Sequence, residues 1–347
     1  MTRVITYGDA IREATEQEML RDPSVFVYGI GVDDPKAVWG TTRLVEKFGA
    51  DRVFDTPLSE DAMTGFGVGA ALAGMRPIHV HIRMDFLMLA VNQLVNLAAK
   101  YRYSTGGAIG VPLVVRAVIG KSWGQGPQHS QGLHALFMHI PGLRVVAPST
   151  PYDAKGLLTT SIRDDDPVMF VEHRLLHAVK GEVPEEQYAL PFGRARTLAR
   201  GGEVTLVGIS YYALECLRAR HLLAEQGISA EVIDPVTLTP LDVETIAASA
   251  RRTGNLVVVD CGWTAAGASA EIVSRVLEAT QDDRPVRVTR MGFAPTVCPT
   301  TPTLEDHFYA NAGTIAEAAH KLLRPRAARW SPDASRAPEL AAFRGPF

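Results

Sequence analysis

The sequence has few cysteines and no long apolar run, and both absences exclude classes of protein. Its 347 residues contain three cysteines, an odd number without metal-ligand spacing, which argues against a disulfide framework and a zinc site. These cysteines are Cys216, Cys261 and Cys298. The most apolar helix candidate, residues 86–99, is too short to cross a bilayer. We therefore expect no membrane insertion.

A charge excess of either sign is also missing. Lys and Arg number 35 against 38 Asp and Glu, a net charge of −3, so nothing indicates binding to nucleic acid or to an anionic membrane. Residues 1–6 lack the charged and then apolar pattern of a signal peptide. The composition, 46% hydrophobic and 21% charged, is globular. We expect a soluble protein of the cytoplasm.

Short apolar runs alternate with amphipathic stretches through the first half of the chain. Such nearly continuous runs are typical of strands covered on both faces in a parallel sheet. The strands expected here are residues 25–29, 52–56, 76–82, 111–118, 143–148 and 168–172. The helices expected between them are residues 61–73, 86–100, 130–139 and 151–162. This alternation predicts an α/β domain with a doubly wound parallel sheet.

A charged segment with Gly181, Pro184 and Pro191 then interrupts the alternation and is typical of a linker. Beyond it we expect strands at 204–209, 229–233, 255–260 and 286–291, and helices at 211–226, 242–252, 268–280 and 314–323. We therefore divide the chain into a first α/β domain (1–175), a linker (176–194), a smaller α/β domain (195–325) and a tail (326–347) rich in Arg and Pro. We expect this tail to be mobile or to lie along a partner.

Local motifs do not identify a self-contained site. Gly65, Gly67 and Gly69 suggest a dinucleotide-binding turn, but the third glycine of that motif is missing and the stretch is helical. His79 and His81 lie in one expected strand, and we take their imidazoles to point to opposite faces and exclude a shared metal. The motifs alone thus predict an α/β protein without a stated chemistry.

A set of longer phrases in fixed order is more informative. They are residues 52–60 (RVFDTPLSE), 69–77 (GAALAGMRP), 96–103 (NLAAKYRY), 128–131 (QHSQ), 140–143 (IPGL) and 148–158 (PSTPYDAKGLL). Together they resemble the beta subunit of thiamine-diphosphate-dependent 2-oxo-acid dehydrogenases of the pyruvate, branched-chain and acetoin type, within the transketolase-like superfamily. The resemblance extends from about Thr6 to Leu323.

The resemblance implies a pyrimidine-binding domain followed by a transketolase-type C-terminal domain. It also implies an alpha subunit that holds magnesium and the cofactor's diphosphate through a Gly-Asp-Gly motif, which this chain lacks; Gly8-Asp9-Ala10 is the nearest approach. We therefore expect half of an active site, completed by an alpha subunit in an α2β2 heterotetramer that can serve a lipoyl acyltransferase.

By the same resemblance, Leu58, Glu60 and Phe86 contact thiamine diphosphate, and Glu60 exchanges a proton with the pyrimidine. His129 acts on the reacting carbonyl or on the acyl acceptor, since histidine shuttles protons near neutral pH. Each has a structural alternative. Glu60 suits a first helical turn behind a Ser59 N-cap, Phe86 suits a core, and His129 suits a solvated loop.

Relatives also suggest a structural potassium ion held by carbonyl oxygens at Leu113, Ser161, Ile162 and Asp164, with the side chain of Asp166 nearby. A surface turn after a helix explains residues 163–167 equally well.

The chain departs from the family at positions thought to carry protons between paired active sites. Ile30-Gly31 and Asn92 stand where relatives have acidic residues, and Arg83 stands where relatives have small or uncharged ones. Arg83 either binds an anionic group or forms a surface pair with Asp85. Two further functions stay open beside 2-oxo-acid decarboxylation with acyl transfer to lipoamide: a transketolase-like or acyloin-forming transferase using the same cofactor, and a scaffolding subunit.

Overall fold

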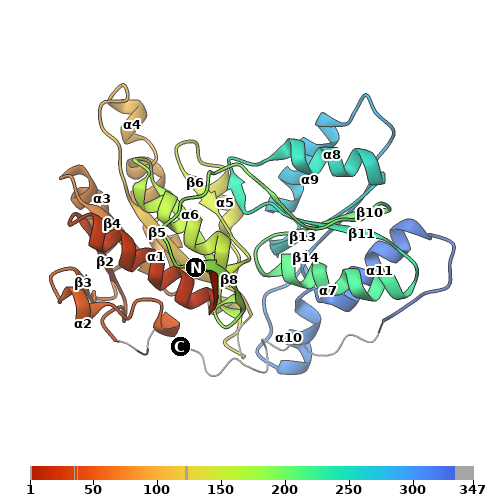
Figure 1. The fold of residues 1–347 in the computed structure, drawn as a ribbon, viewed down its shortest axis with the longest axis horizontal. Helices are drawn as coiled ribbons and strands as arrows, with labels where there is room; N and C mark the ends of the chain where they lie inside the picture. The colour runs from red at the N-terminus through yellow and green to blue at the C-terminus, as the bar shows by residue number, and fades with distance from the viewer. Residues whose placement is uncertain (1, 35, 37, 122–123, 333–347) are drawn as a thin grey trace.

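Two α/β units lie side by side in the molecule (Figure 1). The structure is a computed structural model, and it describes residues 2–332 except 35, 37, 122 and 123. The first unit is formed mainly by the N-terminal half of the chain and the second by the C-terminal half. The expected α/β class, with a pyrimidine-domain sheet and a smaller second sheet, is confirmed.

The first unit is built on a seven-stranded sheet in the order β12-β6-β7-β5-β4-β2-β3. All neighbours are parallel except β12, which is antiparallel to β6. The strands are β2 (Val25–Gly29), β3 (Val53–Phe54), β4 (Arg76–His81), β5 (Val114–Ile119), β6 (Arg144–Val146), β7 (Val168–His173) and β12 (Thr237–Thr239). All six strands expected in this half begin within three residues of their expected start.

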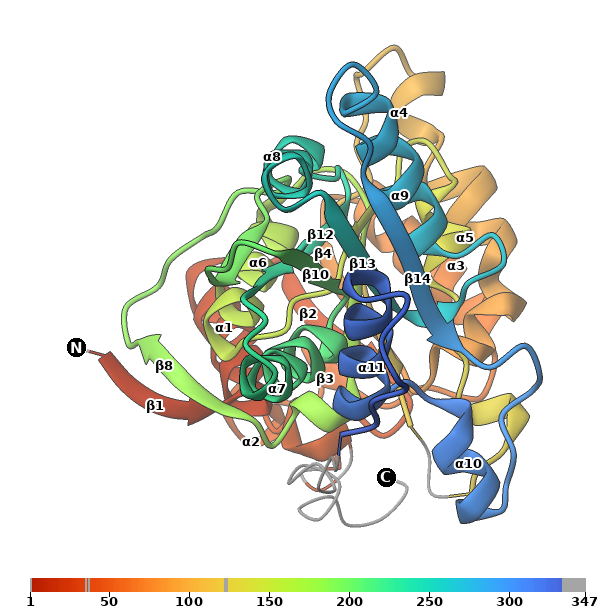
Figure 2. The same cartoon turned by 90° about the vertical axis from the view of Figure 1, so that its right-hand side faces the viewer.

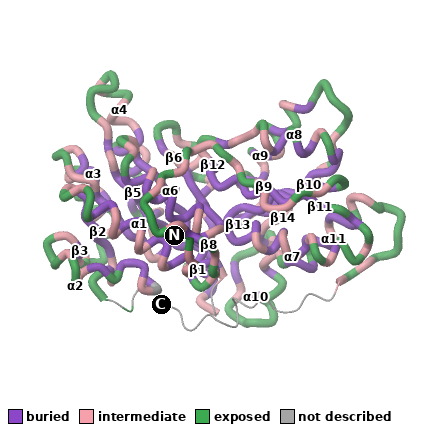
Figure 3. The backbone as a smooth tube through the Cα atoms, viewed as in Figure 1, coloured by how far each residue is buried: buried purple, intermediate pink, exposed green. Residues whose placement is uncertain are grey.

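Helices cover both faces of this sheet, which is why its central strands are apolar on both sides. On one face α1 (Tyr7–Arg21) packs against α6 (Pro151–Arg163), where Pro151 occupies the first turn as expected. The other face carries α3 (Glu60–Leu72), the 3-10 segment η2 (Met84–Ala90), the π-helical segment η3 (Gln93–Ala98) and α5 (His134–Met138). Figure 3 shows the sheet buried, with exposed residues mainly at the periphery, as around α2 and α4.

The second unit is a five-stranded sheet in the order β14-β13-β10-β11-β9, parallel except for β9. Its strands are β9 (Arg196–Ala199), β10 (Val204–Gly208), β11 (Ala230–Asp234), β13 (Asn255–Trp263) and β14 (Arg287–Phe293). Helices α7 (Tyr211–Glu225) and α11 (Ala312–Leu323) pack together on one face, and α8 (Val243–Thr253) and α9 (Ala268–Ala279) on the other (Figure 2). A shorter helix, α10 (Pro302–Phe308), follows β14.

Two local expectations were wrong, and one segment contains a strand that was not expected. The charged segment after β7 is more than a linker, because it contains β8 (Lys180–Pro184), which pairs antiparallel with β1 (Thr2–Thr6) beside the main sheet (Figure 2). The range 86–100 is not one α-helix but the 3-10 segment η2 followed by the π-helical η3. His79 and His81 share a face, as residues two apart in a strand must, and their ring centroids lie 4.1 Å apart.

The remaining short elements are α2 (Val45–Phe48), α4 (Tyr101–Ser104), and the 3-10 turns η1 (Val38–Gly40), η4 (Pro127–His129) and η5 (Arg174–Leu176). The described part of the tail, residues 326–332, lies along its own chain, since Arg329 pairs with Glu317 at 2.7 Å and Trp330 contacts the ring of His320. The rest of the tail is outside the described residues. In the described part of the chain, no helix combines the length and the hydrophobicity that a bilayer crossing requires.

Candidate active site

Phe86 and His129, two of the residues expected at the site, lie beyond the ends of the strands β4 and β5, and Arg174 follows the end of β7. These three strands are neighbours in the sheet, and their carboxyl ends lead into the segments that carry Phe86, His129 and Arg174 respectively. Ligands of open parallel sheets bind beyond the carboxyl ends of the strands. The topology therefore brings together groups that are far apart in the sequence.

Phe86 and His129 are in direct contact. Their ring centroids are 5.3 Å apart, with the rings nearly perpendicular at 79°. Both residues are half-buried, so each remains partly accessible. An aromatic ring held edge-on in this way is positioned to stack on a further ring and to keep the imidazole beside it.

The loop that carries His129 is attached at several points. The hydroxyl of Ser130 donates to the carbonyl of Gly126 at 2.8 Å. Asp85, just before Phe86, accepts from both the backbone and the side-chain nitrogen of Gln131, at 3.1 and 3.0 Å. The segment of η2 that presents Phe86 therefore also binds the loop that presents His129.

The electrostatic surroundings of His129 favour the neutral imidazole. Its pKa is lowered, first by partial burial and then by the guanidinium of Arg83, while Asp85 acts in the opposite direction and Arg174 lowers it further. A neutral imidazole can accept a proton at pH 7 and return it later. This arrangement suits general acid–base chemistry.

Arg83 and Asp85 do not lie on the surface, where one of our two interpretations placed them as a pair. Both residues are buried, with 1% and 7% of their surface exposed. Burial lowers the pKa of Arg83, and the charge of Asp85 opposes that shift. Arg83 is thus part of the interior beside His129.

Glu60 and Leu58 lie on another element, at the start of α3. Ser59 holds the N-cap position and Glu60 the first turn, as the structural alternative requires, but the Ser59 side chain makes no capping hydrogen bond. Leu58 is 79% exposed, and Glu60 is half-buried. Because α3 packs against η2, these two residues belong to the same face of the unit as Phe86.

The carbonyl groups suggested for potassium are close to an arginine. The Arg76 guanidinium donates to the carbonyls of Ile162 and Asp164, at 3.1 and 3.0 Å. The Leu113 carbonyl accepts from the amide of Val168 at 2.9 Å. The side chain of Asp166 pairs with Arg102 and with Arg144. A carbonyl oxygen has a second lone pair, so the oxygen set stays compatible with a weakly bound cation. Ser161, the remaining candidate, is buried in the last turns of α6, and its hydroxyl donates to Leu157 at 2.7 Å.

No comparable set exists for magnesium in the described residues, where groups of three or more His, Cys, Asp or Glu side chains do not converge. The residues that the structure brings around His129 instead fit the aromatic and proton-exchanging part of a cofactor. The diphosphate part would need ligands from elsewhere.

Sequence analysis missed a buried ion pair between the strands under the site. The Arg116 guanidinium on β5 binds the Glu172 carboxylate on β7 through two nitrogens, and both side chains are fully buried. His177 and Thr41 complete this network. The sequence feature that could have revealed this ion pair is one charged residue in each of two neighbouring apolar strands. The pair fixes the strand end from which Arg174 extends.

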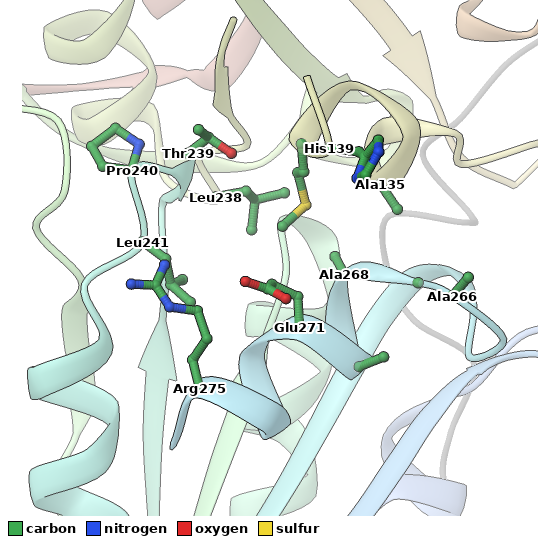
Figure 4. Close-up of a pocket in the computed structure, with 13 residues that line it drawn as sticks. Ala135, His139, Leu238, Thr239, Pro240, Leu241, Ala266, Ala268, Glu271 and Arg275 are labelled. Atoms are coloured by element: carbon green, nitrogen blue, oxygen red, sulfur yellow. The ribbon is translucent and has the colours of Figure 1, made fainter. Parts of the chain in front are cut away.

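A cavity of about 430 Å³ lies apart from these residues, between α5, the segment Leu238–Leu241 and the start of α9 (Figure 4). His139 lines it on one side, and Glu271 and Arg275 of α9 project toward it on the other. It contains none of the residues expected to act in catalysis. The candidate site at the strand ends is therefore separate from this cavity.

Comparison with known proteins gives a consistent result over nearly the whole chain. The family described as "Transketolase, pyrimidine binding domain" matches residues 3–179, and "Transketolase, C-terminal domain" matches residues 193–315. A solved structure described as "Split gene transketolase, inactive beta4 tetramer" is similar in fold, with a TM-score of 0.74 and 22% identity over 92% of this chain and 98% of that one.

Curated relatives are closer in sequence. The beta subunit of the acetoin:2,6-dichlorophenolindophenol oxidoreductase of Cupriavidus necator is 43% identical, over 93% of this chain and 99% of its own length. The beta subunit of 2-oxoisovalerate dehydrogenase of Bacillus subtilis is 40% identical over 92% and 98%. The mitochondrial beta subunit of the pyruvate dehydrogenase E1 component of Dictyostelium discoideum is 37% identical over 92% of each chain.

Proposed function

This chain belongs to the transketolase-like beta subunits of thiamine-diphosphate-dependent 2-oxo-acid dehydrogenases, and on that basis we propose its reaction and the roles of its residues. It is one component of a two-component enzyme that decarboxylates a 2-oxo acid and transfers the acyl group to lipoamide. The observation that carries the assignment of roles is the contact between Phe86 and His129 at the strand ends.

Thiamine diphosphate, when bound, supplies a nucleophilic carbon and an electron sink. Phe86 provides the aromatic surface on which its pyrimidine stacks, with Leu58 as a further apolar contact. Glu60 holds the proton that is exchanged with the pyrimidine nitrogen N1′. His129 exchanges a proton at the carbonyl oxygen of the substrate or with the acyl acceptor, for which its neutral form is suited.

The remaining half of the site comes from an alpha subunit, which supplies the magnesium ligands and the diphosphate contacts. Exposed large apolar residues concentrate on the elements next to Glu60. They are Phe66 on α3, Leu89 on η2, Leu97 on η3 and Tyr103 on α4, with Tyr103 91% exposed. An apolar surface of this kind marks a protein–protein contact. We propose that it packs against a partner subunit in a heterotetramer of two alpha and two beta chains, which delivers the acyl group to a lipoyl acyltransferase.

A potassium ion bound by the carbonyls of Leu113, Ser161, Ile162 and Asp164 has a structural role only. Exchange of KCl for choline chloride should therefore lower the melting temperature of the protein.

A reducing compartment such as the cytoplasm fits the three cysteines, which are free and buried.

Reconstitution tests the proposal. The chain alone should bind thiamine diphosphate weakly and be inactive, because the diphosphate ligands are on the partner. Co-expression with its alpha subunit should give a heterotetramer that releases CO2 from a 2-oxo acid and acylates lipoamide. Tight, magnesium-dependent binding of the cofactor by the isolated chain would refute the division of the site. Transfer to an aldehyde without acylation of lipoamide would favour the transferase.

A further inference from the structure

Arg174, at the end of the first domain predicted from the sequence, contacts the loop of His129 through two nitrogens. It is the first residue after β7, and 1% of its surface is exposed. One terminal nitrogen donates to the backbone carbonyl of His129 at 2.9 Å, and the other donates to the side-chain oxygen of Gln125 at 3.2 Å. A single planar guanidinium thus bonds to two residues of one loop, four positions apart.

This loop has little regular structure to hold it. Apart from the short turn η4, residues 124–133 form no helix or strand. Gly126 has a φ of +73°, and a Cβ there would lie 2.7 Å from the Thr300 side chain, so the loop packs closely against the second unit at a position that requires glycine. The position of the His129 imidazole is therefore set by groups outside the loop. Arg174 is one of them, and it bonds to His129 itself.

The residue type fits this task. Burial lowers the pKa of Arg174 to about 9, with Arg83 adding to the shift and Tyr309, Asp85 and Glu305 opposing it. The group therefore stays charged at neutral pH, and a charged donor makes a stronger bond to a carbonyl than a neutral one. A buried guanidinium is costly in free energy, so a side chain that only filled space would be better replaced by an apolar one.

We infer that Arg174 is a positioning residue for His129: its buried guanidinium holds the loop so that the imidazole lies against Phe86. The inference rests on the proposed catalytic role of His129. The charged groups that act on the imidazole are Arg83 and Asp85, before and in η2, and Arg174 after β7. Glu305 of α10 and Tyr309, which follows it, act on Arg174. Loss of Arg174 removes one of the two positive charges that disfavour protonation of His129.

The test uses the reconstituted heterotetramer with Arg174→Met, Arg174→Lys, His129→Ala and the double variant Arg174→Met/His129→Ala. We expect Arg174→Met to lower kcat about 10–100-fold, with KM for the 2-oxo acid and hydrogen exchange at the cofactor C2 within about twofold of wild type. The acidic limb of kcat should move to higher pH, because His129 becomes easier to protonate. Arg174→Lys keeps the charge and should retain the wild-type limb while losing part of kcat.

The double variant separates positioning from general stability. If Arg174 acts through His129, its loss adds nothing once the imidazole is gone, and the double variant equals His129→Ala. If the losses of kcat in the two single variants multiply in the double variant, the inference is wrong. A wild-type kcat and a wild-type acidic limb in Arg174→Met would also overturn it. If Arg174→Met does not assemble, Arg174→Lys in the His129→Ala background decides in the same way. Unchanged turnover of His129→Ala would refute the proposed role of His129 itself. Arg251→Met, on the surface of α8, is the control for loss of one guanidinium and should behave as wild type.

Discussion

The carboxylate of Asp85 accepts two hydrogen bonds from Gln131, one from the backbone and one from the side chain. Asp85 directly precedes Phe86, and Gln131 lies two residues after His129. These two hydrogen bonds therefore connect the segment of the aromatic ring expected at the cofactor to the loop of the imidazole expected at the substrate.

Glu60→Gln keeps the shape of the side chain but cannot exchange the required proton. We expect hydrogen–deuterium exchange at the cofactor C2 in the assembled enzyme to slow by about 10²–10⁴-fold with the fold intact. Asp61→Asn is the matched control, since it removes the neighbouring negative charge from the same first turn of α3. A wild-type exchange rate in Glu60→Gln would leave Glu60 a surface residue of the helix.

His129→Ala acts after cofactor activation. We expect C2 exchange to remain near the wild-type rate while product formation falls by about 10²–10⁴-fold, the usual contribution of general acid–base help. His139→Ala removes a histidine that lines the separate cavity and should leave both rates unchanged. If His129→Ala turns over with the natural acceptor at the wild-type rate, His129 is only a loop residue.

Arg83→Met tests whether the buried guanidinium beside His129 selects the substrate. A guanidinium binds a carboxylate through paired hydrogen bonds, so its loss should reduce kcat/KM for a 2-oxo acid with a second carboxylate more than for one with an apolar chain. We expect the ratio of the two kcat/KM values to change by about tenfold. An unchanged ratio would assign Arg83 to the structure of η2.

The two active sites of the heterotetramer should react independently. Ile30-Gly31 and Asn92 replace the acidic residues expected to carry a proton between them, and the side chain of Asn92 is bonded locally to Asn96 at 2.9 Å. Rapid-quench measurement of bound acyl groups should therefore find a burst that corresponds to all sites. A burst of half that size would contradict the prediction.

Asp234 should make the stability of the chain depend on pH. Burial raises its pKa to about 7, with Asp153 adding to the shift, while hydrogen bonds from Ser149 and Val236 oppose it. Its unfolded pKa is about 3.9. Between these values the folded state binds more protons than the unfolded state, so the free energy of unfolding falls as pH rises from about 4 to 7, by an amount on the order of a few kcal/mol.

Thermal unfolding of Asp234→Asn checks this sign. The amide cannot ionise, so the melting temperature of the variant should change less between pH 5 and pH 8 than that of the wild type. Asp283→Asn, at an exposed position after α9, should keep the wild-type slope. Equal slopes for the wild type and Asp234→Asn would show that Asp234 does not carry the dependence.

The sequence by itself determined the elements whose residue pattern follows from burial and local backbone geometry. The apolar runs predict β2, β4 and β7 because strands covered on both faces must be apolar throughout, and Pro151 marks the start of α6 because the first turn needs no amide hydrogen. The ordered phrases determined the family and, by resemblance, the assignment of Glu60, Phe86 and His129.

Only the tertiary structure decided which remote groups meet. The short β12 joins the sheet of the first unit although it belongs to the second half of the chain. Strand β8 lies within the expected linker and pairs with β1. The bond from Arg174 to His129 and the pairing of Arg116 with Glu172 join residues without any local pattern in common. The reason is physical: a buried charge or a short strand is stable only with its partner in place, and the partner is chosen by the fold.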